Sequence, residues 1–360
     1  MSKKTSKNHL YFTKRLLEWN FSMNSRNMPW KFEKNPYKIW LSEIILQQTR
    51  VEQGTTYYNN FIKKYPTIQQ LAAGKDTEVF KLWEGLGYYS RCKNLLATAR
   101  NIVENFEGKF PASYDELIQL KGIGPYTASA IASFAFKLPH AVVDGNVTRV
   151  LSRFFGISTP IDSSEGKKIF TSLANELLDK KSPDLYNQAI MDFGATVCKP
   201  KSPLCNDCIF SSDCFAFHHD QVDDFPIKEK KIIKKQRWFY YFIIEYKGNF
   251  YIKKREKKDI WEGLHEFVMI ESEQKSSPKK LIQFNKLFSD TFQILKMNKI
   301  SKVYKQQLTH QTIHAVFIHL ESQKNINLPP YITTSKKNLS KLAFPKIINQ
   351  FLNDSLILHS

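Results

Sequence analysis

Four cysteines gathered in one short stretch limit what this chain can fold into more than any other feature of its sequence. Cys198, Cys205, Cys208 and Cys214 follow one another with six, two and five residues between them. Thiolates bind metals as closed sets of four, and the two-residue gap lets neighbouring sulfur atoms converge on one centre. The spacing therefore predicts a four-cysteine metal site, although it does not separate zinc from a [4Fe–4S] cluster.

The sequence shows neither a membrane-spanning segment nor a secretory signal, and this indicates the cellular compartment. No apolar run approaches the length of a membrane span, and the first residues, MSKKTSKNHLYF, lack the apolar centre of a secretory signal. We therefore expect a reducing, cytoplasmic location in which structural disulfides are rare. The fifth cysteine, Cys92, stands apart on a helical segment and is expected to be a small buried hydrophobic residue.

The charge balance points to polyanionic partners. The 360 residues contain 53 Lys and Arg against 34 Asp and Glu, a net charge of +19 with a pI of about 9.5. Such an excess favours nucleic acid first and acidic membrane surfaces second. Since a lysine-rich composition alone inflates surface charge, the balance makes nucleic acid only a modest favourite.

Residues 1–217 have the hydrophobic periodicity of a helical region. Asn35 and Pro36 form a good helix start, because Asn caps a first turn and Pro suits its first position. Short Gly and Pro breaks separate the expected helical segments. These segments are Pro36–Tyr58, Asp76–Leu86, Arg91–Asn105, Tyr114–Leu120 and Pro125–Phe136.

The sequence changes character after the last cysteine of the group. Residues 218–236 are expected to form a basic linker, since Lys228–Arg237 (KEKKIIKKQR) is dominated by Lys and Arg. Beyond the linker, aromatic and β-branched runs predict strands at Trp238–Tyr246, Phe250–Lys254 and Ala315–Leu320. A second, α+β domain is therefore expected over residues 237–360.

A glycine-rich turn separates two of the expected helices. Leu120-Lys121-Gly122-Ile123-Gly124 precedes Pro125, which opens the second helix. Backbone N–H groups of such a turn, together with the positive end of the following helix, favour a phosphate. On its own, however, this pattern is usually an ordinary interhelical turn.

Two carboxylates stand out as candidate catalytic groups. Asp144 precedes a helix that begins near Gly145, so on pattern alone an N-cap is at least as good a role as catalysis. Glu43 lies on a helix with Trp40, Ile44 and Leu46, where loss of solvation would raise its pKa and make it a general acid. The alternative is an exposed helical glutamate.

Longer strings resemble a known family. LKGIGPYTASAIASFAF, VVDGNVTRVLSR and the cysteine spacing resemble the endonuclease III branch of the helix-hairpin-helix DNA glycosylases. PWKFEKNPYKIWLSEIILQQTRVEQ, LWEGLGYYSRCKNLLATA and NQAIMDFGATVC resemble its adenine DNA glycosylase (MutY-type) branch in particular. The resemblance runs from about residue 10 to 217, which is nearly the whole helical region.

The resemblance implies a fold and a cofactor. It implies an all-α helix-hairpin-helix glycosylase domain over residues 1–217, with a six-helix barrel at about 28–136. The N-terminal helix and residues 137–217 would form an iron–sulfur subdomain. One [4Fe–4S] cluster per chain would be structural and would order a basic loop that carries Lys199 and Lys201.

The resemblance also implies a reaction. Glu43 would be the general acid, Asp144 would stabilise an oxocarbenium-like sugar or attack it, and Asn146 would position the sugar or the water. The related strand-cleaving enzymes have a lysine nucleophile at the position of Tyr126. A phenol cannot form an imine, so we expect a monofunctional enzyme that leaves an abasic site.

The implied partner is double-stranded DNA with adenine opposite 8-oxoguanine or guanine, bound by a monomer at the bacterial nucleoid. Buried acids require the target base to leave the helical stack, so residues that wedge into the duplex are needed. The implied DNA contacts are Gln48, Thr49, Arg50, Tyr88, Lys121, Gly122 and Gly124. The implied adenine pocket contains Tyr126 with Arg26, Trp30, Lys31 and Leu46, where Lys31 replaces a more usual arginine.

The C-terminal region resembles the Nudix-like domain of the same branch. The resemblance rests on WEGLHEF at Trp261–Phe267 and on Leu308-Thr309-His310. By this likeness Thr309 and His310 would contact 8-oxoguanine. Lysines follow Glu273 where Nudix hydrolases have a glutamate-rich helix for Mg²⁺, so we expect no pyrophosphatase activity.

Two other functions remain open at this point. One is a bifunctional glycosylase and lyase for oxidised pyrimidines, which the absence of lysine at Tyr126 opposes. The other is a non-catalytic DNA-binding protein with a four-cysteine zinc site and carboxylates without a catalytic role.

Overall fold

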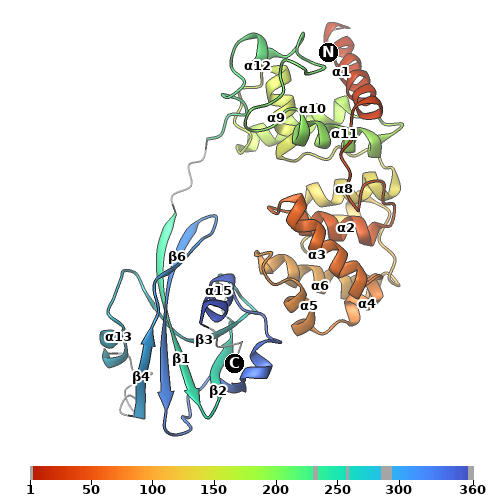
Figure 1. The fold of residues 1–360 in the computed structure, drawn as a ribbon. Helices are drawn as coiled ribbons and strands as arrows, with labels where there is room; N and C mark the ends of the chain where they lie inside the picture. Colours follow the sequence, from red (N-terminus) through yellow and green to blue (C-terminus); the bar gives the residue numbers. More distant parts are fainter. Residues whose placement is uncertain (1–2, 230–233, 257–258, 285–293, 356–360) are drawn as a thin grey trace. The chain divides into compact units, whose positions relative to one another are not determined.

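The computed structural model describes residues 3–229, 234–256, 259–284 and 294–355. The chain divides into two compact units (Figure 1). The first unit comprises residues 1–73 and 94–230, and the second comprises residues 74–93 and 231–360. The short segment 74–93 is thus grouped with the C-terminal residues and not with the helices on either side of it.

The first unit is built from helices, which confirms the expected all-α region. Its helices are α1 (Lys3–Ser22), α2 (Pro36–Leu46), α3 (Val51–Lys64), α4 (Ile68–Ala73), α6 (Tyr89–Asn105, whose first residues belong to the second unit), α7 (Tyr114–Leu117), α8 (Pro125–Phe136), α9 (Gly145–Phe155), α10 (Ser164–Leu177), α11 (Pro183–Thr196) and α12 (Phe215–His218). Within the described residues, no helix is long and apolar enough to cross a membrane.

The first of the expected helical segments is interrupted. The Asn35 side chain caps α2 by accepting bonds from the backbone N–H groups of Tyr37 and Lys38, as the sequence predicts. The helix then stops at Leu46, because Gln48 adopts a left-handed backbone with φ of 56°. The expected continuous segment to Tyr58 is therefore wrong, and residues 47–50 form a tight break before α3.

The N-terminal helix packs against residues far along the chain. Phe12 and Leu16 of α1 are fully buried in a cluster that also contains residues of α9, α10 and α11. The ring of Phe12 stacks on that of Phe210 with 4.6 Å between centroids. Figure 1 shows α1 beside α10 and α11, and α11 in turn packs against α9.

The chain stays on the first unit beyond the four cysteines. Arg153 donates from Nε to the carbonyl of Phe225, and the N–H of Ile161 donates to the carbonyl of Ile227. The N–H of Glu229 donates to the carboxylate of Asp162. Much of the stretch 218–236, expected to be a linker, is therefore attached to the first unit, and residues 230–233 lie outside the described residues.

The second unit contains a mixed sheet. Its elements are α5 (Asp76–Leu82), β1 (Lys235–Tyr246), β2 (Asn249–Lys254), β3 (His265–Ser272), α13 (Pro278–Phe284), β4 (Leu295–Ile300), β5 (Tyr304–Gln307), β6 (Gln311–Ser322), β7 (Ile332–Ser335), α14 (Lys336–Leu339) and α15 (Lys346–Asp354). In the described residues the strand order is β4-β6-β1-β3-β2-β7, and β5 also pairs with β6. β1 runs parallel to β6 and antiparallel to β3. The expected α+β fold is confirmed.

The central strand β1 is buried on both sides. Tyr240 and Phe242 belong to an apolar cluster against which Leu281 of α13 packs. On the opposite side Tyr241 stacks on Phe317, which in turn stacks on a ring of α15 with 4.0 Å between centroids. Burial on both faces explains why the sequence of β1 is a continuous apolar run and not an alternating one.

Candidate active site

Three helix ends in the first unit bring the candidate catalytic residues together. Glu43 lies near the end of α2, Tyr126 in the first turn of α8, and Asp144 directly before α9. All three line one cavity of about 500 Å³. The other lining residues are Arg26, Met28, Trp30, Leu46, Gln47, Gln48, Thr49, Val51, Phe134, Val143, Asn146, Gln188 and Met191.

Glu43 is a buried carboxyl with one strong partner. Its side chain is 7% exposed, and Oε2 accepts a hydrogen bond of 2.7 Å from the hydroxyl of Tyr126. Burial raises the pKa of Glu43 to about 7, the bond from Tyr126 opposes the rise, and the charge of Asp144 adds to it. The expected exposed-glutamate alternative is therefore wrong, and near neutral pH a large share of Glu43 carries a proton.

Asp144 is both a helix cap and a cavity residue. Its Oδ1 accepts bonds of 2.8 Å from the backbone N–H groups of Asn146 and Val147, and its Oδ2 accepts a bond of 2.6 Å from Asn146 Nδ2. Burial raises the pKa of Asp144, while these donors and the charge of Arg149 act in the opposite direction. The sequence leaves open whether Asp144 is a helix cap or a catalytic residue. The structure allows both, because the carboxylate that caps α9 also lines the cavity.

Arg149 supports this arrangement from one turn further along α9. Arg149 is 8% exposed, and its guanidinium donates a bond of 2.9 Å to Asn146 Oδ1, which leaves the amide Nδ2 of Asn146 for Asp144. The same guanidinium donates to the carbonyls of Gly194 and Cys198. Sequence reasoning did not single out Arg149. A charged residue on the apolar face of an amphipathic helix could have indicated a buried side chain with specific partners.

The four cysteines belong to the stretch between α11 and α12, and the Sγ of Cys214 lies 3.5 Å from the carbonyl oxygen of Arg153 on α9. All four are free thiols, and Arg153 Nη1 lies 3.5 Å from the Sγ of Cys198. Burial raises the pKa of Cys208 to about 12, a bond from the N–H of Phe210 opposes the rise, and negative charge on each of the other three sulfurs adds to it. Across the described residues, however, no three or more His, Cys, Asp or Glu side chains form a group that could hold a metal ion.

Not all residues of the expected adenine pocket line the 500 Å³ cavity, which is called the large cavity below. Arg26, Trp30 and Leu46 line the large cavity, as expected. Lys31 does not line it, because its ammonium lies 3.2 Å from the carboxylate of Asp192 and donates to the carbonyl of Arg26. Gln188, which sequence reasoning missed, contributes to the wall from α11.

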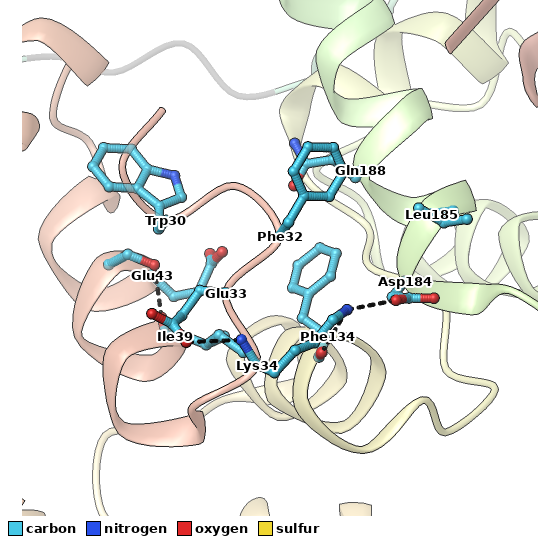
Figure 2. A pocket seen from close by; sticks show the side chains of 11 residues that line it. Trp30, Phe32, Glu33, Lys34, Ile39, Glu43, Phe134, Asp184, Leu185 and Gln188 are labelled. Carbon is cyan, nitrogen blue, oxygen red and sulfur yellow. Dashed lines mark hydrogen bonds and ion pairs between the residues drawn. The ribbon is translucent and has the colours of Figure 1, made fainter. Parts of the chain in front are cut away.

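A second, smaller cavity also has Glu43 in its wall (Figure 2). Its volume is about 30 Å³, and it shares Trp30, Glu43, Phe134 and Gln188 with the large cavity. On its outer rim Lys34 forms an ion pair of 2.6 Å with Asp184. A space of this size is too small for a purine and has room for roughly one or two water molecules.

The expected DNA contacts of the first unit lie in two places. Gln48 and Thr49 line the large cavity at the break between α2 and α3, and Arg50 is the residue directly before α3. Lys121, Gly122 and Gly124 form the turn between α7 and α8.

The turn itself requires glycine. Gly122 has φ of 78°, and a Cβ there would lie 2.7 Å from the Cβ of Asn94. Gly124 precedes α8 without a side-chain cap, so the first N–H groups of α8 are open to an anion. The carbonyl of Lys121 accepts a bond of 2.6 Å from Thr98, which anchors the turn to α6.

The remaining expected contacts belong to the second unit. Tyr88 is 45% exposed, has φ of 47°, and its hydroxyl bonds to the hydroxyl of Thr309. Tyr88, Thr309 and His310 line a cavity of about 560 Å³ with Trp261. These residues are therefore brought together, at a place distinct from the cavity that contains Glu43.

Comparisons with known proteins match two families to the chain. Residues 41–176 match the HhH-GPD superfamily of base excision DNA repair proteins, and residues 240–354 match the NUDIX domain family. The adenine DNA glycosylase of Buchnera aphidicola subsp. Schizaphis graminum is 34% identical over 347 residues, which cover 95% of this chain and 97% of the relative.

Solved structures resemble the helical part of the chain. A thermostable thymine-DNA glycosylase aligns with a TM-score of 0.56 at 28% identity, over 60% of this chain and 99% of that one. A non-covalent endonuclease III–DNA complex aligns with a TM-score of 0.52 at 21% identity, over 60% of this chain and 97% of that one. The second likeness concerns the fold alone. Together with the sequence matches, they confirm the expected helix-hairpin-helix and Nudix-like folds.

Proposed function

The chain belongs to the adenine DNA glycosylase family within the HhH-GPD superfamily, and from this membership we propose that Glu43 and Asp144 together hydrolyse the bond between adenine and deoxyribose. The enzyme is a monofunctional DNA N-glycosylase of base excision repair. The observation that carries the choice of residues is the buried Glu43, bonded to Tyr126, in the same cavity as the half-buried Asp144.

The two carboxyl groups take opposite parts in the reaction. Protonated Glu43 donates its proton to a ring nitrogen of the extruded adenine, so that the base leaves with the electron pair of the glycosidic bond. The ionised carboxylate of Asp144 stabilises the positive charge that develops on the sugar. A water molecule then adds to the anomeric carbon, and its proton returns to Glu43. Asn146, held by Arg149, orients Asp144 for this role.

Tyr126 limits the reaction to hydrolysis. Strand cleavage through an imine requires an amine nucleophile against the sugar, and Tyr126 offers a phenol whose hydroxyl is committed to Glu43. Burial raises the pKa of Tyr126 well above its ordinary value, so that the phenol stays neutral. The product is therefore an intact strand with an abasic site.

Adenine occupies the large cavity between Trp30 and Leu46. The volume of about 500 Å³ accommodates a base and its sugar. Arg26 and Gln188 provide polar groups at the wall, while Lys31 supports that wall from behind. In this assignment Lys31, which was expected in the adenine pocket, acts through Asp192 and does not contact the base.

The partner is double-stranded DNA that carries adenine opposite 8-oxoguanine or guanine, bound by a single chain. Gln48 at the cavity mouth and Tyr88 in the second unit wedge into the duplex, and the turn of Gly122 and Gly124 holds a phosphate. Thr309 and His310 recognise 8-oxoguanine. The charge supports this assignment, because residues 231–360 carry 23 Lys and Arg against 10 Asp and Glu.

Cys198, Cys205, Cys208 and Cys214 hold a [4Fe–4S] cluster in this proposal. The chemistry of the donor set supports this proposal, because cysteine thiolates are the usual ligands of iron–sulfur clusters and the sulfur of Cys208 interacts electrostatically with the other three. The cluster supplies structural order to the loop that carries Lys199 and Lys201. Broad visible absorption of the purified protein, lost in Cys208→Ser, is the expected result, and a colourless protein that contains only zinc would refute it.

One assay tests the whole proposal. A labelled duplex with adenine opposite 8-oxoguanine is incubated with the enzyme and analysed with and without hot alkali. Strand breaks that appear only after alkali are expected, because the enzyme leaves an abasic site. Breaks without alkali would indicate a lyase, and no breaks in either sample would remove the assignment.

A further inference from the structure

A carboxylate outside the cavity gathers the donors that shape its wall. Asp192 of α11 is fully buried and does not line the cavity. Its Oδ1 accepts bonds of 2.8 Å from Arg26 and 3.0 Å from Gln188, and its Oδ2 accepts 2.9 Å from Asn24. The ammonium of Lys31 lies 3.2 Å from the same Oδ2. The hydrogen bonds and ion pairs from these four donors compensate the cost of burying the charge of Asp192. Loss of any one donor would leave part of that cost uncompensated.

Three of these donors come from the segment between α1 and α2. Residues 23–35, between α1 and α2, form no helix or strand. Asn24, Arg26 and Lys31 attach this segment to Asp192, and Lys31 also donates 2.6 Å to the carbonyl of Arg26. Since Arg26 and Trp30 of the same segment line the large cavity, the position of one cavity wall depends on Asp192.

The fourth donor fixes the orientation of an amide. Gln188 lies one turn before Asp192 on α11 and lines the large cavity. An ionised carboxylate accepts hydrogen bonds and donates none, so the Nε2 of Gln188 must face Asp192. The amide oxygen Oε1 is therefore the atom that Gln188 offers to a base in the cavity.

We propose that Asp192 is a positioning residue that sets the hydrogen-bonding polarity of the base pocket by holding Gln188 and Arg26. The wall then presents an amide acceptor and a guanidinium donor. Adenine carries an amino donor at C6 beside ring nitrogens that accept, and it matches this pattern. A 6-oxopurine has an acceptor at C6 and would face the amide oxygen without a bond. This inference rests on the proposed function of the cavity.

Asp192→Asn tests the inference with little change in shape. An Asn side chain has one acceptor and one donor group, so its amide opposes the NH₂ group of Gln188 or that of Asn24, and one of them must turn. Single-turnover excision is measured on matched duplexes that carry either adenine or unsubstituted purine, which lacks the 6-amino group. We expect the adenine-to-purine rate ratio to fall about tenfold or more, since only adenine uses the oriented acceptor.

A double-mutant cycle separates positioning from general support. Gln188→Ala removes the acceptor itself, so it is expected to lower the same ratio, and the double variant is expected to lower it no further. If Asp192 contributed only to stability, Asp192→Asn would slow both bases equally and leave the ratio unchanged. Glu165→Gln, an exposed acid on α10, is the matched control for removal of one negative charge.

The outcomes distinguish this inference from the proposed function. A wild-type enzyme that excises neither base would refute the proposed function. Wild-type excision of adenine with an unchanged ratio in Asp192→Asn would overturn the positioning role alone. If Asp192→Asn does not fold, Gln188→Ala still tests the inference. An unchanged adenine-to-purine rate ratio in Gln188→Ala would show that the Gln188 amide does not select adenine, and Asp192 would then have no selectivity to set.

Discussion

The hydroxyl of Tyr126 donates a 2.7 Å hydrogen bond to Oε2 of Glu43, in the position where strand-cleaving relatives of the helix-hairpin-helix superfamily are expected to have a lysine. The bond joins α8 to α2 and leaves the other carboxyl oxygen of Glu43 free of Tyr126. Because a phenol donates without carrying charge, Glu43 keeps a raised pKa instead of forming an ion pair. In the proposed mechanism, Tyr126 therefore offers no amine nucleophile and leaves Glu43 able to act as the general acid.

Replacement of the acid should separate chemistry from binding. Glu43→Gln keeps the size of the side chain and can still accept the bond from Tyr126, but it has no proton to donate at neutral pH. We expect the single-turnover excision rate to fall by about 10²–10⁴-fold. Affinity for a duplex with adenine opposite 8-oxoguanine, measured by a gel-shift assay, should change little. Near-normal excision by this variant would remove Glu43 from the mechanism.

The pH dependence follows from the raised pKa of Glu43. The active form has Glu43 protonated, so single-turnover excision should decline as pH rises through about 7. Asp144 must be ionised in the active form, and burial raises its pKa. The loss of activity at low pH should therefore occur at a higher pH than the ordinary pKa of an aspartate. Tyr126→Phe removes a bond that lowers the pKa of Glu43, and the alkaline limb should therefore move to higher pH. A limb that stays fixed in Tyr126→Phe would contradict this coupling.

Asp144→Asn separates the two roles of Asp144. Asn accepts the capping bonds about as well as Asp, but its Nδ2 opposes the Nδ2 of Asn146, so the variant should lose about 1–2 kcal/mol of stability in denaturant unfolding. The charge opposite the sugar is lost, and we expect excision to slow by a hundredfold or more, on the order of other losses of transition-state electrostatics. As the contrasting control, Asp144→Ala removes cap and charge together and should also cost about 0.5–2 kcal/mol of stability. Retained activity in Asp144→Asn would reduce Asp144 to a cap.

Local signals in the sequence were enough for much of the fold. Asn35 and Pro36 mark the start of α2, and Pro125 and Phe136 bound α8 as expected, because capping and periodicity act over only a few residues. The break at Gln48 could not be predicted in the same way. No Gly or Pro marks it, and a non-glycine residue takes a left-handed conformation there only because tertiary packing enforces it.

Pairs that are distant in sequence explain what was missed at the site. Asp144 and Glu43 were identifiable from their own surroundings and from family resemblance. Arg149, Gln188 and Asp192 act through partners on other segments, and no local pattern records that Asp192 will meet Arg26. Lys31 was misplaced for the same reason. It follows Trp30, which lines the cavity, but its own side chain pairs with the distant Asp192.

The turn before α8 offers a test of DNA binding that leaves the acids untouched. In Gly122→Ala the backbone keeps a φ of 78° only with strain of about 1–3 kcal/mol, and the new methyl lies 2.7 Å from the Cβ of Asn94. The turn should open, and affinity for undamaged and damaged duplexes should fall together, by about tenfold for each 1.4 kcal/mol lost.

Gly248→Ala provides the matched control for strain alone. Gly248 lies in the turn between β1 and β2 with φ of 71°, and an added Cβ there meets nothing within 4 Å. This variant should lose stability in thermal unfolding without loss of duplex affinity. If Gly122→Ala lowered the melting temperature similarly and bound DNA as tightly as wild type in fluorescence anisotropy, the glycine turn would be an interhelical connection without a role in phosphate binding.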